Sequence, residues 1–183
     1  KEVMEAAEAA GKELAFEASV GGGIPIIDPL KHSLIANEIT SVMGIVNGTT
    51  NYMLTRMADN GLSYEDALHE AQQKGFAEAD PTADVGGFDA AAKIAILASI
   101  AFNSRVTLDD VFTDGITNIS PVDIEAARDM GYVIKLLAIA HRREDGVDVR
   151  VHPTMIPTNH QLATVNGVFN AIYVVGDLSL IHI

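Results

Sequence analysis

The sequence predicts an α+β fold, with a mixed sheet that is mainly antiparallel in its C-terminal half and with helices packed on it. Three observations support this prediction. Helix-like segments with capping residues at their ends occupy most of the chain before residue 131. Beyond that point the pattern changes to β-rich runs, two of which are joined across Asp145-Gly146, a strong hairpin signal. Residues 88–102 are apolar around almost their whole helical circumference, which is typical of a helix buried in a core.

Start and stop signals place the individual elements. Ser63, with Asp66 three residues later, is a natural N-cap, and Ser120-Pro121 combines a cap with a first-turn proline. We expect helices over residues 2–10, 25–36, 48–60, 64–74, 88–102 and 121–130. We expect strands over residues 14–20, 39–47, 132–144, 147–157 and 168–176, and an acidic loop over residues 75–87.

The composition excludes several classes of protein. The 183 residues include 25 Asp plus Glu against 12 Lys plus Arg, so no basic surface is available to neutralise the phosphates of a nucleic acid. No cysteine is present, which rules out disulfides, thiolate metal sites and a cysteine nucleophile. No uninterrupted apolar run reaches the roughly 18 residues of a membrane span, and no signal peptide is recognisable. We therefore expect a soluble, cytoplasmic protein with neither nucleic acid nor a membrane as its partner.

The residues that could carry chemistry are concentrated between positions 78 and 93. Four carboxylates and one amine lie within this stretch: Glu78, Asp80, Asp84, Asp89 and Lys93. Asp89 and Lys93 are four residues apart at the start of a helix, so they share one face, with the acid on the N-terminal side. Burial disfavours the charged form of a lysine, whereas a neighbouring carboxylate favours it. A pair in that balance is suited to acid/base catalysis.

Two other interpretations of this stretch stay open on the residues alone. Asp89 and Lys93 can form an ordinary ion pair at a helix mouth, with residues 78–84 as a solvated loop. Alternatively, the carboxylates can bind magnesium or manganese, which prefer such oxygens, although this gives the lysine no role.

Other familiar motifs are missing. The glycines at 21–23 follow a predicted strand, but they match neither G-x-G-x-x-G nor G-x-x-x-x-G-K-[ST], so the chain has no nucleotide-binding fingerprint. His152 and His160 lack the H-E-x-x-H spacing of a zinc site, and no G-x-S-x-G elbow supports a hydrolase.

Several long motifs carry a resemblance to a known family. They are FEASVGGGIPII (16–27), MGIVNGTTNYML (43–54), GFAEADPTADVGGFDAAAKIAILA (75–98), and GYVIKLLAIA followed by VHPTMIP. In this order they resemble homoserine dehydrogenases. The resemblance covers residues 1–177, which it identifies as a catalytic and dimerisation domain, whereas residues 178–183 form a tail that does not resemble the family.

The resemblance implies an activity and partners. It implies a reversible hydride transfer in which homoserine and oxidised NAD or NADP give aspartate 4-semialdehyde and the reduced cofactor. It places the reaction in threonine, methionine and isoleucine biosynthesis, and it implies a homodimer formed through the C-terminal sheet. The family's N-terminal Rossmann domain, with a lysine that it contributes to the active site, has no counterpart in this sequence. We therefore expect the chain alone to be inactive, and a rival hypothesis is that it serves only as an interaction module.

The resemblance also assigns roles to residues. It makes Lys93 the catalytic lysine and Asp89 its paired aspartate. Glu78, in the E-x-D-P sequence, matches the glutamate that holds the ammonium group of homoserine. Asp84 matches a supporting carboxylate, and Thr49 a position that lines the substrate pocket.

A monovalent-cation site, such as one for Na⁺, is a further implication of the resemblance. It would use oxygens around four residues: Glu17, Val20, Gly22 and Ile24. The alternative is a tight turn in which glycine is needed only for its backbone conformation.

Overall fold

The structure is a computed structural model that describes residues 2–178 and 180–182. Its helices are α1 (Glu2–Ala9), the π-helical turn η1 (Pro29–Ser33), α2 (Gly48–Asn60), α3 (Tyr64–Gln73), α4 (Thr82–Val85), α5 (Phe88–Ala101), the 3-10 turn η2 (Leu108–Asp110), α6 (Pro121–Asp129) and the 3-10 turn η3 (Gln161–Thr164). Its strands are β1 (Ile39–Ile45), β2 (Phe112–Thr113), β3 (Tyr132–Arg143), β4 (Gly146–Pro157), β5 (Ala171–Gly176) and β6 (Leu180–His182).

The strands form one mixed sheet with the order β2-β4-β3-β1-β5-β6. β3 and β4 make the long hairpin that the sequence predicts, and β1 lies antiparallel between β3 and β5. Only β2 runs parallel to its neighbour, β4. The predicted α+β class and the mainly antiparallel sheet are therefore confirmed, and β1 is added to the middle of that sheet from the N-terminal half of the chain.

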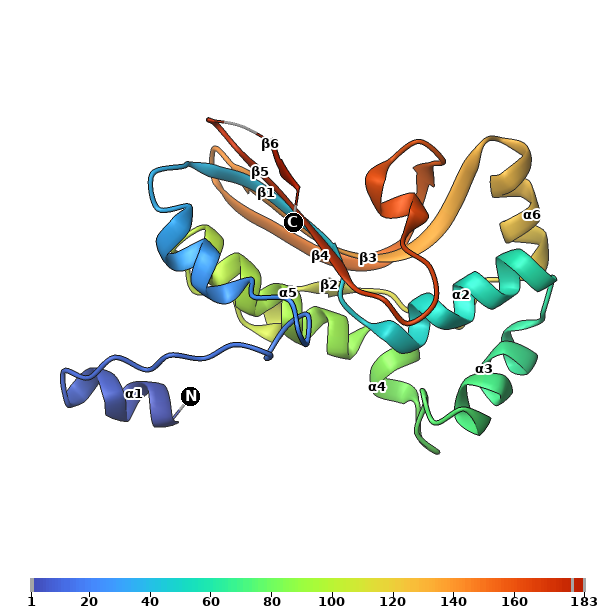
Figure 1. Cartoon of the computed structure of the whole chain (residues 1–183), viewed down its shortest axis with the longest axis horizontal. Coiled ribbons are helices and arrows are strands. Elements are labelled where there is room, and N and C mark those ends of the chain that lie inside the picture. The colour runs from blue at the N-terminus through green and yellow to red at the C-terminus, as the bar shows by residue number, and fades with distance from the viewer. Residues whose placement is uncertain (1, 179, 183) are drawn as a thin grey trace.

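Helices cover one face of the sheet. Figure 1 shows α5 and α2 on the same side of the sheet. The larger hydrophobic core lies between these layers, where Ile94 and Leu97 of α5 and Met53 of α2 are fully buried. α5 is therefore the core helix that its apolar sequence predicts, although Phe88, at its first position, is 50% exposed.

The opposite face, which we call the outer face, is covered only in part. A second, smaller cluster lies there, in which Leu137 and Ile139 of β3 contact Leu162 of η3. In Figure 1 the segment that contains η3 lies over one end of this face, and no other helix packs on it in the described part of the chain. Beyond η3, β1 presents the half-buried apolar side chain of Met43 on this face, whereas β4 presents polar side chains such as Arg150 and His152, which lie opposite Ile139 and Leu137.

Several sequence expectations are wrong in detail. Residues 14–20 are not a strand, because they have no neighbouring strand to pair with and Ala18 has a left-handed conformation (φ 56°) that interrupts an extended path. The helix expected over residues 25–36 is shorter and partly π-helical. The loop expected over residues 75–87 contains the short helix α4, and the two-residue strand β2 was not predicted.

The third strand of the C-terminal sheet also begins later than predicted. β5 starts at Ala171, because residues 168–170 pass close to α2 instead of pairing with β1. A Cβ atom at Gly48 would lie 2.8 Å from the carbonyl oxygen of Val168, so only glycine allows this approach.

Candidate active site

Lys93 and Asp89 form the ion pair that their spacing predicts. Gly87, in a left-handed conformation (φ 83°), turns the chain into α5, which places Asp89 in the first turn and Lys93 one turn later. Nζ of Lys93 lies 2.6 Å from Oδ2 of Asp89 and 2.9 Å from the carbonyl oxygen of Val46, just beyond β1. The two side chains are 24% and 32% exposed, so the pair is partly withdrawn from solvent and is anchored to the sheet.

The ammonium group of Lys93 retains hydrogen-bonding capacity. It carries three N–H donors. Asp89 and Val46 accept from it, and no third acceptor is found in the described part of the chain. One donor is therefore available to a bound molecule.

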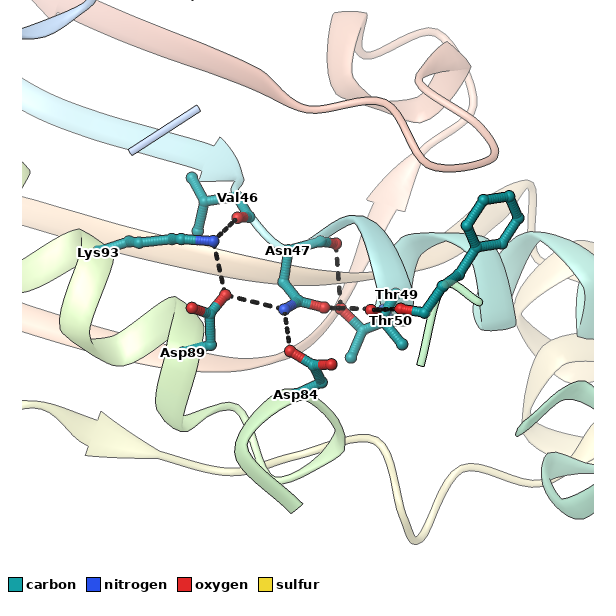
Figure 2. A network of polar contacts seen from close by, with 8 residues as sticks. Val46, Asn47, Thr49, Thr50, Asp84, Asp89 and Lys93 are labelled. Carbon is teal, nitrogen blue, oxygen red and sulfur yellow. Dashed lines mark hydrogen bonds and ion pairs between the residues drawn. The ribbon is translucent and has the colours of Figure 1, made fainter. Parts of the chain in front are cut away.

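Asn47 connects this pair to a second carboxylate. Its Nδ2 atom donates to Oδ1 of Asp84 at 2.7 Å and to Oδ2 of Asp89 at 2.9 Å. Its Oδ1 atom accepts from the backbone N–H of Thr50 at 2.9 Å and so caps α2. Figure 2 shows the resulting chain of contacts from Lys93 through Asp89 and Asn47 to Asp84 and Thr50. Asn47 was not among the residues predicted from the sequence, although an asparagine between a strand and a helix is a recognisable N-cap signal.

Asp84 reaches this network because the acidic loop folds into α4. Oδ1 of Asp80 accepts from both the backbone N–H and the hydroxyl of Thr82, which fixes the entry to that helix. These hydrogen bonds lower the pKa of the Asp80 carboxyl group. Asp80 therefore has a structural role, whereas Asp84 points toward Asn47.

Thr49 and Glu78 are placed around the network, not in it. The hydroxyl of Thr49 donates to the carbonyl oxygen of Phe76 at 2.6 Å and so holds the start of the acidic loop against α2. The backbone carbonyl of Glu78 accepts from Gln72, whereas its carboxylate is exposed and makes no hydrogen bond or ion pair with any residue that the structure describes. Glu78 is thus free to bind a ligand.

The side chain of Tyr52 secures the same loop from α2. Its ring lies edge-on to that of Phe76, with centroids 4.9 Å apart, and its hydroxyl donates to Glu70 of α3 at 2.8 Å. Hydrogen bonds from Tyr52, Arg56 and Lys74 lower the pKa of the Glu70 carboxyl group to about 2. α2, α3 and the acidic loop therefore form one connected wall beside the network.

The network does not favour the magnesium or manganese hypothesis. The amide group of Asn47 occupies the space between Asp84 and Asp89 and offers N–H donors there, where a cation would need lone pairs. Among residues 2–178 and 180–182, no group of three or more His, Asp or Glu side chains could hold a metal ion.

The segment expected to hold a monovalent cation is a tight turn between α1 and η1. Both carboxylate oxygens of Glu17 accept backbone N–H groups, from Ile27 and Asp28. Val20 is fully buried, and Gly22 has a positive φ of 58° that a side chain would strain. The side chain of Glu17 therefore stabilises the turn, and backbone carbonyl groups are the oxygens left for a cation.

Comparison with known proteins identifies the family. A family model described as homoserine dehydrogenase matches residues 25–180. Homoserine dehydrogenase from Corynebacterium glutamicum is 56% identical over 178 residues, which cover 94% of this chain and 40% of that enzyme. Homoserine dehydrogenase from Synechocystis is 54% identical over 180 residues, which cover 96% of this chain and 42% of that enzyme. The crystal structure of a homoserine dehydrogenase from Thiobacillus denitrificans superposes with a TM-score of 0.94 at 47% identity, over 98% of this chain and 42% of that one.

These matches share one property. This chain spans about two fifths of the length of the relatives that it matches. No helix in residues 2–178 and 180–182 is long and apolar enough to cross a membrane. Because the family model matches residues 25–180 and a member of the family is 56% identical over 94% of this chain, the chain belongs to the homoserine dehydrogenase family.

Proposed function

We propose that this chain is the substrate-binding and catalytic part of an NAD(P)-dependent homoserine dehydrogenase. Such an enzyme interconverts homoserine and aspartate 4-semialdehyde, in the cytoplasm, on the route to threonine, methionine and isoleucine. The observation that carries the proposal is the lysine of α5. Lys93 is held by Asp89 and Val46 and still has one N–H donor for a ligand, in a chain of this family.

The chemistry assigned to this chain is the movement of one proton. In the direction of homoserine oxidation, the O–H bond of the substrate breaks and its proton passes to Nζ of a neutral Lys93, which becomes an ammonium group. In the reverse direction Lys93 returns that proton to the aldehyde oxygen. Asp89 stabilises the ammonium form at 2.6 Å.

The hydride chemistry belongs to the nicotinamide dinucleotide when it is bound. The residues of this chain do not fit a dinucleotide site, because the sequence contains no glycine fingerprint. We propose that the cofactor is bound by the part of such an enzyme that the match with longer relatives leaves uncovered.

Three residues are proposed to hold the substrate. The exposed carboxylate of Glu78 is suited to the ammonium group of homoserine, since charge-assisted hydrogen bonds of this kind are strong. Asp84, within the network, is proposed as a second carboxylate that stabilises the same ammonium group. Thr49, whose hydroxyl is engaged with Phe76, contributes to the pocket wall and keeps the Glu78 loop in place.

A homodimer formed through the outer face is part of the proposal. Met43 of β1, which lies opposite the buried Ile139 of β3, leaves a half-exposed apolar patch on this face. A second copy with the same surface would remove it from water. We also retain a monovalent cation such as Na⁺, held by backbone oxygens around Glu17, Val20, Gly22 and Ile24, as a proposal.

A segment exchange tests the function. The matched segment of the Corynebacterium glutamicum enzyme is replaced by this chain, and we call the product the segment-swap enzyme. Homoserine-dependent reduction of NAD or NADP by the segment-swap enzyme is the expected result. A folded but inactive segment-swap enzyme, beside an active parent treated in the same way, would favour the interaction-module hypothesis. The isolated chain is expected to bind NAD and NADP very weakly at most in titration calorimetry.

A further inference from the structure

The side-chain amide of Asn47 has a fixed orientation. Its Oδ1 atom lies 2.9 Å from the backbone nitrogen of Thr50, which can only donate, so the oxygen must face α2. The Nδ2 atom must then face the carboxylates of Asp84 and Asp89, which accept when ionised. The orientation therefore follows from the partners alone.

The amide of Asn47 is also fully used. It carries two N–H donors, and one is directed to each of the two carboxylates. The residue is only 6% exposed, so water does not compete freely for these bonds. A buried donor that loses its acceptor carries a desolvation cost, which opposes movement of either carboxylate away from Asn47.

The two carboxylates come from different elements, α4 and α5, and both are negative. Without a bridge they would repel each other, and nothing else among the described contacts joins Asp84 to Asp89. Asn47 lies in the short connection between β1 and α2. Its neighbour Val46 accepts a hydrogen bond from Lys93 through its carbonyl oxygen. The same junction therefore controls the position of both carboxylates and the lysine.

We infer that Asn47 is a positioning residue that fixes Asp84 and Asp89 relative to Lys93, in addition to capping α2. This inference rests on the proposed function, because it matters for turnover only if Lys93 transfers the proton. Asn47 itself contacts neither the substrate nor the reacting atoms in this role. It acts through the carboxylate that holds the lysine and through the carboxylate that supports the substrate.

The capping role and the positioning role can be separated by substitution. Asn47→Ser retains a good N-cap for α2, but the serine side chain is too short to bridge two carboxylates. Asn47→Asp also retains the cap and nearly the same shape, but it replaces the N–H donors by a third carboxylate. Ser63→Ala is the matched control, because Ser63 caps α3 through the backbone N–H of Asp66 and has no contact with the network.

Steady-state kinetics of the segment-swap enzyme test the role. We expect Asn47→Ser to lower kcat/KM for homoserine roughly tenfold to a hundredfold, with a lower kcat and a higher KM, because both proton transfer and substrate support depend on the misplaced carboxylates. Asn47→Asp is expected to be at least as impaired. In the double variant Asn47→Ser/Asp89→Asn, the loss of kcat/KM should be smaller than the product of the two single-variant losses, since both substitutions act through Asp89. Ser63→Ala should lower the melting temperature and leave kcat and KM unchanged.

A spectroscopic measurement on the 183-residue chain does not depend on activity. The two side-chain amide protons of Asn47 should give separate NMR signals, one of which moves in Asp84→Asn and the other in Asp89→Asn. If neither signal moves, the bridge does not exist and the inference is overturned. If the signals move but the kinetics of Asn47→Ser match those of Ser63→Ala, Asn47 is only a cap. An inactive unsubstituted segment-swap enzyme would instead overturn the proposed function.

Discussion

Lys93 and Asn47 donate hydrogen bonds to the same atom, Oδ2 of Asp89, at 2.6 and 2.9 Å. One donor comes from the same helix as the acceptor and the other from the N-cap of α2. The carboxylate is therefore fixed from two directions, and the lysine is fixed with it. This arrangement distinguishes the pair from a flexible ion pair on an exposed helix.

The first prediction concerns Lys93 in the segment-swap enzyme. If it transfers the hydroxyl proton, Lys93→Ala should lower kcat about 10²-fold or more, with a smaller effect on substrate binding. Asp89→Asn should show a weaker form of the same defect, because it removes the charge that orients the lysine and keeps the shape. Steady-state rates, with circular dichroism to confirm the fold, provide the measurement.

A matched control for Lys93 is Lys74, the C-cap residue of α3. Lys74 and Glu70 are also four residues apart and lie 3.0 Å from each other, but the lysine side chain is 50% exposed. Lys74→Ala should leave turnover unchanged. Near-normal turnover in Lys93→Ala as well would mean that Lys93 is an ordinary ion-pair partner, with a contribution of about 0.5 kcal/mol to stability.

The second prediction concerns Glu78. Glu78→Gln keeps the size of the side chain and removes the charge proposed to hold the ammonium group of homoserine. The Michaelis constant for homoserine should therefore rise more than kcat falls. Glu65→Gln, at an exposed position of α3, is the control and should change neither value. An unchanged Michaelis constant in Glu78→Gln would remove this residue from the substrate site.

The parts of the fold that depend on local signals were predicted from the sequence. α3 and α6 begin where Ser63 and Ser120 predicted, because each serine accepts the backbone N–H three residues later. The pair Asp89 and Lys93 was predictable for the same reason, since residues four apart on a helix are neighbours.

The parts that depend on distant contacts were not predicted. Asn47 lies 37 and 42 residues from Asp84 and Asp89, so no local pattern connects them. The error at residues 14–20 has a similar cause, because a strand requires a partner and none is adjacent. The position of β1 in the middle of the sheet likewise follows from pairing with strands almost a hundred residues or more away.

The third prediction concerns the outer face. Met43→Lys places a charge at the centre of this face, opposite Ile139 on the neighbouring strand. If two copies associate there, the substitution should convert a dimer into a monomer, because an unpaired charge would be buried in the interface. Sedimentation velocity at tens of micromolar is the measurement. Val122→Lys, at a position of α6 that is 72% exposed, is the control and should stay dimeric. A monomeric unsubstituted chain that is well folded would contradict the proposed interface.

The last prediction uses a second lysine, which lies in a dry environment away from the catalytic pair. Lys135 of β3 is 3% exposed, and its Nζ atom donates to the carbonyl oxygen of Val165 at 2.7 Å and to the side chains of Asn166 and Asn51 at 2.9 and 3.2 Å. All three acceptors are neutral. Burial lowers the pKa of Lys135 from 10.5 to about 8, and the charge of Asp59 opposes this shift only partly.

The pH dependence of stability follows from this lowered pKa. Between about pH 8 and pH 10.5, Lys135 holds a proton in the unfolded chain that it has lost in the folded one, so the free energy of unfolding rises with pH. From pH 8 to pH 10 the rise from this residue is about 2 kcal/mol, and below pH 8 its slope disappears. Urea unfolding of the unsubstituted chain and of Lys135→Met over this range isolates the effect as the difference between the two curves. The methionine removes three hydrogen bonds, although the carbonyl oxygen of Val165 still accepts from Nδ2 of Asn51, and it shifts stability without producing a slope because it does not titrate. Parallel curves above pH 8 would show that Lys135 titrates in the folded protein as it does in the unfolded chain.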